Sequence, residues 1–242
     1  MRLENHAIPS EGGDICALRY IPDGAPKEIA LIYAHGFTAG KYTFDGLAGY
    51  LAGKGYEGLT FDFVGHKLGG TGGELLRMTQ IVENLQAVLA WHRSHTTAKR
   101  IALVGHSMGA VAVMGAAIRD AQSPASPPLA GTACLCMGVN PEIGFQSVVG
   151  RSMQAQRADY VRGAPVAELS AQLGALLPTS RELGSLPALF VAAQQDVLFS
   201  VERVERLAEV AGANTSVVRI ESSHQEAPDK SKMALLKWLE TL

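Results

Sequence analysis

Residues 101–110 read Ile-Ala-Leu-Val-Gly-His-Ser-Met-Gly-Ala. A short apolar run is followed by Gly105, Ser107 and Gly109 and then by small residues, which is the Gly-x-Ser-x-Gly pattern at a junction of strand, tight turn and helix. Because glycine has no β-carbon, Gly105 and Gly109 let the strand and the helix approach each other closely. The helix N-terminus adds free N–H groups and a positive partial charge beside Ser107. The stretch therefore predicts that Ser107 is a nucleophile held in a strained turn.

Strands and helices alternate on both sides of this stretch. Apolar or alternating runs predict strands, and amphipathic periodicity predicts helices. The predicted strands, besides the one before Gly105, cover residues 3–9, 15–21, 29–34, 57–63, 131–139, 186–193 and 216–220, and the predicted helices cover 42–54, 78–95, 110–118, 201–211 and 230–241. The first two strands are expected to form a hairpin. The alternation predicts an α/β fold with a mostly parallel central sheet and helices on both faces, whose ligands bind at the carboxyl ends of the strands.

The alternation of strands and helices stops between about residues 140 and 185. This region shows helical segments, among them residues 166–177, but no strand pattern. We interpret it as a small helical cap inserted into a single domain that spans residues 1–242.

Composition narrows the class of protein. The chain has 242 residues, 47% of them hydrophobic, and a formal net charge of −2, which does not suit a nucleic-acid partner. The first residues lack the apolar core of a signal peptide, and we see no apolar run long enough to span a membrane. Three cysteines argue against a disulfide framework. We expect a cytoplasmic protein without membrane or nucleic-acid partners, and we leave the oligomeric state open.

A nucleophilic serine needs a base, and the base needs an acid that fixes its tautomer. His224 stands in the loop between the last predicted strand and the last helix, which makes it the expected base. His106 adjoins Ser107, so its side chain is expected to point elsewhere. Asp196 follows a buried strand directly and is the expected acid, with Glu142 as the alternative. Asp62, in an Asp-x-x-Gly pattern, is expected to structure a loop instead.

The tetrahedral intermediate of such chemistry needs two N–H donors. Met108 follows the nucleophile, and Phe37 follows the pair His35-Gly36 at the end of a predicted strand. We expect the backbone N–H groups of Phe37 and Met108 to form this oxyanion hole.

These motifs together resemble the α/β-hydrolase superfamily, over nearly the whole chain. The stretches that carry the resemblance are His35-Gly36-Phe37-Thr38-Ala39, Phe61-Asp62-Phe63-Val64-Gly65-His66, Gly105-His106-Ser107-Met108-Gly109, Asp196 and His224. Within that superfamily the chain resembles small bacterial carboxylesterases of the cinnamoyl and feruloyl type and, more loosely, monoacylglycerol lipases. The loop Lys67-Leu68-Gly69-Gly70-Thr71-Gly72 departs from the shorter Gly-x-Ser-x-Gly stretch found there.

The resemblance implies an α/β-hydrolase fold and hydrolysis of a small-molecule ester or thioester through an acyl-serine, with no cofactor and no metal. Amide or carbon–carbon bond hydrolysis, acyl transfer, or a non-catalytic binding role on the same fold are the alternatives. The acyl pocket is expected to be apolar and roofed by the cap. Its expected lining includes Phe145, Val149, Met153 and Tyr160.

Overall fold

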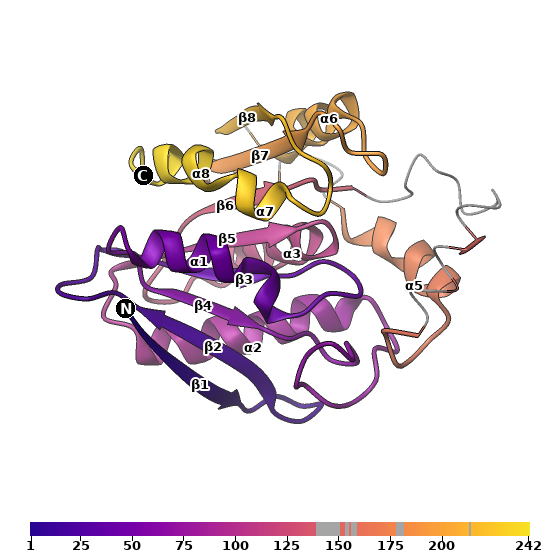
Figure 1. Cartoon of the computed structure of the whole chain (residues 1–242), viewed down its shortest axis with the longest axis horizontal. Coiled ribbons are helices and arrows are strands. Elements are labelled where there is room, and N and C mark those ends of the chain that lie inside the picture. Colours follow the sequence, from indigo (N-terminus) through magenta and orange to yellow (C-terminus); the bar gives the residue numbers. More distant parts are fainter. Residues whose placement is uncertain (139–150, 153–154, 156–158, 178–181, 213) are drawn as a thin grey trace.

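The computed structural model describes residues 1–138, 151–152, 155, 159–177, 182–212 and 214–242. Its centre is an eight-stranded sheet in the order β1-β2-β4-β3-β5-β6-β7-β8 (Figure 1). The strands are β1 (Arg2–Ile8), β2 (Ile15–Ile21), β3 (Ile29–Ala34), β4 (Gly58–Phe61), β5 (Arg100–His106), β6 (Leu129–Leu135), β7 (Ala188–Ala193) and β8 (Thr215–Ile220). The hairpin β1–β2 and the pair β2–β4 are antiparallel, and all other neighbours are parallel. The α/β-hydrolase fold predicted from the sequence is confirmed.

Helices cover both faces of the sheet (Figure 1). One face carries α1 (Asp45–Ala52), which follows the 3-10 turn η1 (Lys41–Phe44), together with α7 (Ala227–Lys230) and α8 (Lys232–Leu239). The other face carries α2 (Thr79–His95), α3 (Met108–Gln122) and α6 (Val201–Ala211). Between β6 and β7 the chain forms α5 (Val166–Leu173) and the 3-10 turn η2 (Gly174–Leu176).

Strand β3 shows why the sheet interior is apolar throughout. All six of its residues are buried. Successive side chains of a strand point to opposite faces, so Leu31 and Tyr33 join the core under α1 and α8, whereas Ile32 and Ala34 join the core under α2 and α3. A strand covered on both faces reads as a continuous apolar run, which is the pattern of this segment.

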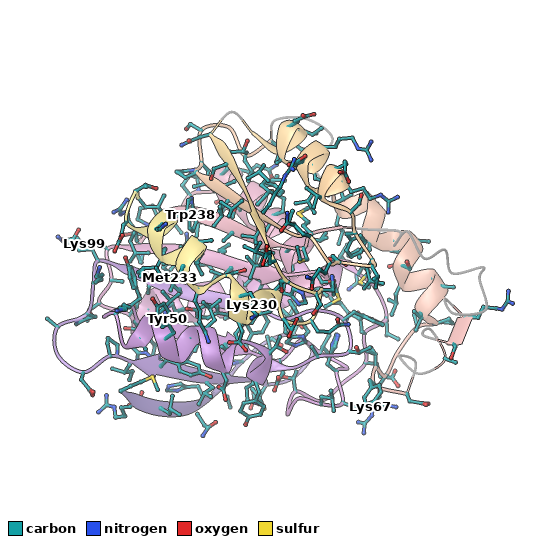
Figure 2. All side chains as sticks on the ribbon, turned by 45° about the horizontal axis from the view of Figure 1, so that its top comes forward. Tyr50, Lys67, Lys99, Lys230, Met233 and Trp238 are labelled. Atoms are coloured by element: carbon teal, nitrogen blue, oxygen red, sulfur yellow. The ribbon has the colours of Figure 1, made fainter. Side chains whose placement is uncertain are left out.

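The packing of α1 against α8 closes one face. Tyr50 of α1 donates a hydrogen bond from its hydroxyl to Met233 Sδ of α8 at 3.3 Å (Figure 2). Trp238 of α8 is buried over β6, where a β-carbon on Gly131 would lie 2.8 Å from the indole ring. The glycine at this point of β6 therefore lets the indole approach the sheet.

Most elements differ from their predicted bounds by a few residues, and three of these differences have a local cause. Strand β4 ends at Phe61, because the side chain of Asp62 turns toward Lys41 and the main chain leaves the parallel ladder. Strand β6 ends at Leu135, because Cys136 has φ 48°. The last helix, predicted over residues 230–241, is α8 and spans Lys232–Leu239, and the short helix α7 precedes it. Between the two, the hydroxyl of Ser231 donates a hydrogen bond to the carbonyl of Ala227 at 2.6 Å. In the parts of the chain that the structure describes, none of the helices has the length and apolar character needed to cross a bilayer.

Candidate active site

Ser107 lies in a strained turn between β5 and α3. Its backbone has φ 55° and ψ −117°, a combination that a non-glycine residue rarely adopts. The flanking glycines explain how the turn is closed: a β-carbon on Gly105 would lie 2.2 Å from the carbonyl oxygen of Gly109, and one on Gly109 would lie 2.0 Å from that of Ala34. The backbones of β3, β5 and α3 therefore meet at contact distance around Ser107.

His224 and Asp196 form a hydrogen-bonded pair at the same edge of the sheet. Asp196 follows β7 and His224 lies between β8 and α7, so both stand at carboxyl ends of parallel strands. The Nδ1 of His224 lies 2.7 Å from Oδ2 of Asp196. The carboxylate can only accept here, so Nδ1 carries the hydrogen and Nε2 is left with a lone pair.

Backbone N–H groups hold the other oxygen of the Asp196 carboxylate. Oδ1 accepts from Leu198 at 2.7 Å and from Phe199 at 3.1 Å. Burial by itself raises the pKa of Asp196, but the hydrogen bonds from His224, Leu198 and Phe199 outweigh it and leave that pKa below its usual value. The carboxylate therefore stays charged beside His224.

Ser107 and His224 line one pocket of about 300 Å³. The remaining lining comes from the loop after β3 and from the neighbours of the two residues: Gly36, Phe37, Thr38, Ala39, Thr43, His106 and Gln225. Besides the two imidazoles, the described lining around Ser107 consists of apolar groups, hydroxyls and a carboxamide, which suits an uncharged ligand.

His35 orients the peptide bond that precedes Phe37. Its Nε2 accepts a hydrogen bond from the backbone N–H of Phe63 at 3.0 Å, so the hydrogen is on Nδ1, which donates to the carbonyl of Gly36 at 2.8 Å. Ala39 N–H donates to the same carbonyl at 3.2 Å. In a trans peptide the N–H points opposite to the carbonyl, so the Phe37 N–H faces away from His35. Burial, aided by the neighbouring His66, lowers the pKa of His35 to about 3 and keeps this tautomer neutral.

Met108 is the residue expected to supply the second N–H. It is the first residue of α3, where backbone N–H groups have no partner within the helix. The structure thus places the N–H groups of Phe37 and Met108 on the two segments that flank Ser107.

Asp62 structures a loop, as its sequence pattern predicts. Its carboxylate accepts the backbone N–H and the ammonium of Lys41, both at 2.6 Å, and the N–H of Gly70 at 2.8 Å. The hydroxyl of Thr71 donates to its carbonyl at 2.8 Å. The buried Asp62 carboxylate therefore connects the segment after Phe37, through Lys41, with the loop of residues 67–73, through Gly70.

Two buried residues beside the pair were not identified from the sequence. The ring of His106 lies 4.7 Å from that of His224, and its Nε2 lies 2.8 Å from the His224 carbonyl oxygen. Cys136 is buried beside Asp196, and burial, aided by the Asp196 carboxylate, raises the pKa of its thiol. Donor atoms of His106, Cys136 and His224 lie within 4.8 Å of one another, the only such metal-ligand group among the described residues. Nε2 of His106 and Nδ1 of His224 already have partners within the site, whereas Nδ1 of His106 is buried without one, and we assign the group to the support of His224 and Asp196.

Most residues expected to line the acyl pocket cannot be placed. Phe145, Val149 and Met153, and the alternative acid Glu142, lie outside the described residues. Tyr160 is described, and its side chain is 44% exposed. Its carbonyl accepts the N–H of Lys67 at 2.8 Å, which joins this segment to the loop of residues 67–73 (Lys67 is labelled in Figure 2). Tyr160 does not line the pocket at Ser107 that the described residues form, so its role stays a prediction.

A serine on a strained turn between strand and helix, with a histidine–aspartate pair on loops farther along the same sheet edge, defines a serine hydrolase of the α/β-hydrolase superfamily. Residues 25–154 match the family model described as serine aminopeptidase, S33, and the chain belongs to that family. A search of curated proteins gave no significant match.

Solved structures with the same fold include several esterases. A putative hydrolase from Agrobacterium vitis S4 is 17% identical, with a TM-score of 0.75 over 98% of this chain and 99% of the other. The Pyrococcus furiosus esterase PF2001 is 18% identical, with a TM-score of 0.73 over 99% and 91%. Est1E from Butyrivibrio proteoclasticus, solved with ferulic acid bound, is 18% identical, with a TM-score of 0.70 over 97% and 99%. At these identities the likeness establishes the fold and leaves the substrate open.

Proposed function

We propose that this hydrolase cleaves small carboxylic esters or thioesters through an acyl-enzyme on Ser107. The observation that carries the proposal is the 2.7 Å hydrogen bond between His224 Nδ1 and Asp196 Oδ2, with His224 lining the same pocket as Ser107. This bond leaves Nε2 of His224 as the basic atom. Such a histidine acts as general base toward a serine hydroxyl.

The proposed acylation step transfers one proton and exchanges one bond. Ser107 Oγ attacks the carbonyl carbon while its proton passes to His224 Nε2. The carbonyl oxygen becomes an oxyanion that accepts hydrogen bonds from the N–H groups of Phe37 and Met108, and each such donor is worth about 10²- to 10³-fold in turnover. The intermediate collapses when His224 protonates the leaving alcohol or thiol.

Deacylation repeats the cycle with water. His224 takes a proton from the water, which attacks the acyl-serine carbonyl, and then returns the proton to Ser107 Oγ. The charged Asp196 stabilises the imidazolium that forms in both steps. Release of the carboxylic acid restores the free enzyme.

The choice of ester over amide rests on two supports. Apart from its two imidazoles, the described pocket lining of apolar groups, hydroxyls and a carboxamide suits a neutral acyl group. PF2001, which shares the fold, bears the name of an esterase, and Est1E was solved with ferulic acid bound. The family description favours the alternative, hydrolysis of an N-terminal peptide bond.

A substrate panel separates the two functions. The purified protein is assayed with p-nitrophenyl esters of increasing acyl length, one acyl thioester and a set of aminoacyl p-nitroanilides. The same panel measured with Ser107→Ala gives the ratio of ester to anilide cleavage that follows from leaving-group reactivity alone. We expect kcat/KM of the parent protein for the best ester to exceed that for the best anilide by at least about 10²-fold more than this ratio. Efficient cleavage of anilides with poor cleavage of all esters would replace this proposal by the aminopeptidase function.

A further inference from the structure

The side chain that immediately precedes Ser107 contacts the main chain of His224. His106 ends β5, is 5% exposed, and places Nε2 at 2.8 Å from the His224 carbonyl oxygen, across 118 residues of sequence. A carbonyl oxygen only accepts, so the ring nitrogen donates. The hydrogen bond joins the strand that carries Ser107 to the loop that carries His224.

His224 is thereby held at two points. Asp196 fixes the ring through Nδ1, which sets its rotation and its tautomer. His106 fixes the backbone of the same residue, and the two rings lie 4.7 Å apart at an interplanar angle of 47°. In the sheet, β6 and β7 separate β5, which leads to Ser107, from β8, which leads to the loop of His224. The hydrogen bond from His106 to His224 connects the end of β5 with that loop directly, and it therefore helps to set the separation of Ser107 and His224.

We propose that His106 is a positioning residue, whose Nε2–H holds the His224 backbone so that the His224 ring reaches Ser107. The inference rests on the proposed function, since it assigns His224 as the base. Burial and the neighbouring His224 lower the pKa of His106 to about 3. A neutral ring at this point donates its hydrogen bond without placing a second positive charge beside the imidazolium of the reaction.

Two substitutions of His106 distinguish the effect of its hydrogen-bond donor from the effect of its side-chain length. In His106→Gln the amide nitrogen is as many bonds from Cα as Nε2, so it can donate to the same carbonyl. In His106→Met the chain has the same length but no donor. The control is His92→Met, which removes a fully buried histidine on α2, outside the candidate site.

The readouts are kcat and KM for a p-nitrophenyl ester and the rate at which a fluorophosphonate labels Ser107. We expect His106→Met to lower kcat and the labelling rate by about 10- to 100-fold, the loss that a misplacement near 1 Å produces, with KM within about twofold of the parent value. His106→Gln should stay within about threefold, and His92→Met should label at the parent rate. Thermal unfolding confirms that each variant is folded at the assay temperature.

The outcomes are distinguishable. Equal labelling of His106→Met and the parent protein, a change in KM alone, or a folded His106→Gln as slow as His106→Met would overturn the positioning role. A parent protein that no fluorophosphonate labels would overturn the proposed function instead.

Discussion

Asp196→Asn changes one atom of the candidate site and keeps its shape. Oδ1 of Asp196 accepts two backbone N–H groups, from Leu198 and Phe199, and an amide nitrogen cannot replace it there. The new NH₂ group therefore takes the place of Oδ2 and faces His224 Nδ1, which is 2.7 Å away. His224 must then present a lone pair at Nδ1 and carry its hydrogen on Nε2, the tautomer that cannot accept a proton from Ser107.

We expect kcat to fall by about 10⁴-fold, equivalent to about 5 kcal/mol in the activation barrier, because the same change of tautomer has this effect in other serine hydrolases. The unfolding temperature should change little, since each polar atom keeps a partner. The assay is kcat for a p-nitrophenyl ester, with Asp120→Asn as the control, because Asp120 forms a largely buried ion pair with Arg93 between α3 and α2, outside the candidate site.

A value of kcat for Asp196→Asn within tenfold of the parent would refute this reasoning. The companion variant Glu142→Gln tests the alternative acid. If it proved the more damaging of the two changes, the acid would follow the earlier strand β6.

Three further predictions concern packing, pH and the segment beyond β6. Gly109→Ala should destabilise the fold by about 3 kcal/mol or more, because its β-carbon would lie 2.0 Å from the Ala34 carbonyl oxygen, whereas Gly174→Ala, whose β-carbon meets nothing within 4 Å, should be neutral. Denaturant unfolding measures the stability of both variants, and equal stability of the two would contradict the close packing at Gly109. Burial lowers the pKa values of His35, His66, His92 and His106 in the fold to about 3 or 4, so below about pH 6.5 the unfolded chain takes up protons that the folded chain does not bind. The free energy of unfolding should therefore fall as pH drops from about 6.5 toward 4, by up to about 1.4 kcal/mol per pH unit for each of these histidines. A denaturation midpoint that stays level between about pH 7 and 5 would contradict this. Met153→Ala and Tyr160→Ala should shift the ratio of hydrolysis rates for long and short acyl chains by about one or two orders of magnitude, while a fluorophosphonate still labels Ser107. Met233→Ala on α8 is the control. An unchanged ratio would mean that another segment, such as the loop of residues 67–73, lines the acyl pocket.

The succession of strands and helices along the chain, and the polar residues at the strand ends, could be predicted from the sequence. Each parallel strand except β8 is a largely apolar run, and its polar successor falls at the edge where ligands bind. This logic brought Ser107, Asp196 and His224 to one edge, and the described geometry has them there. This prediction from the sequence was possible because the signals are local: a run of apolar residues, a glycine at the turn, and one polar residue after the strand.

The contacts that support these residues could not be predicted, because they depend on long-range pairing and on backbone angles. Asp62 was recognised as a loop residue, but its partner Lys41 lies 21 positions earlier. Cys136 follows β6 with φ 48° and lies beside Asp196, and no local pattern in the sequence signals that backbone angle. His106 was expected to point away from the site, and the direction of its ring is fixed only by the His224 carbonyl 118 residues later.

The most direct test of the account is the site of covalent labelling. The protein and Ser107→Ala are treated with a fluorophosphonate, digested, and analysed by mass spectrometry, and kcat for a p-nitrophenyl ester is measured on the same samples. The account predicts one adduct, on the peptide that contains Ser107, no adduct on the variant, and a loss of turnover in the folded variant of about 10⁴- to 10⁶-fold. An adduct on another residue, or a Ser107→Ala variant that turns over esters at close to the parent rate, would contradict it.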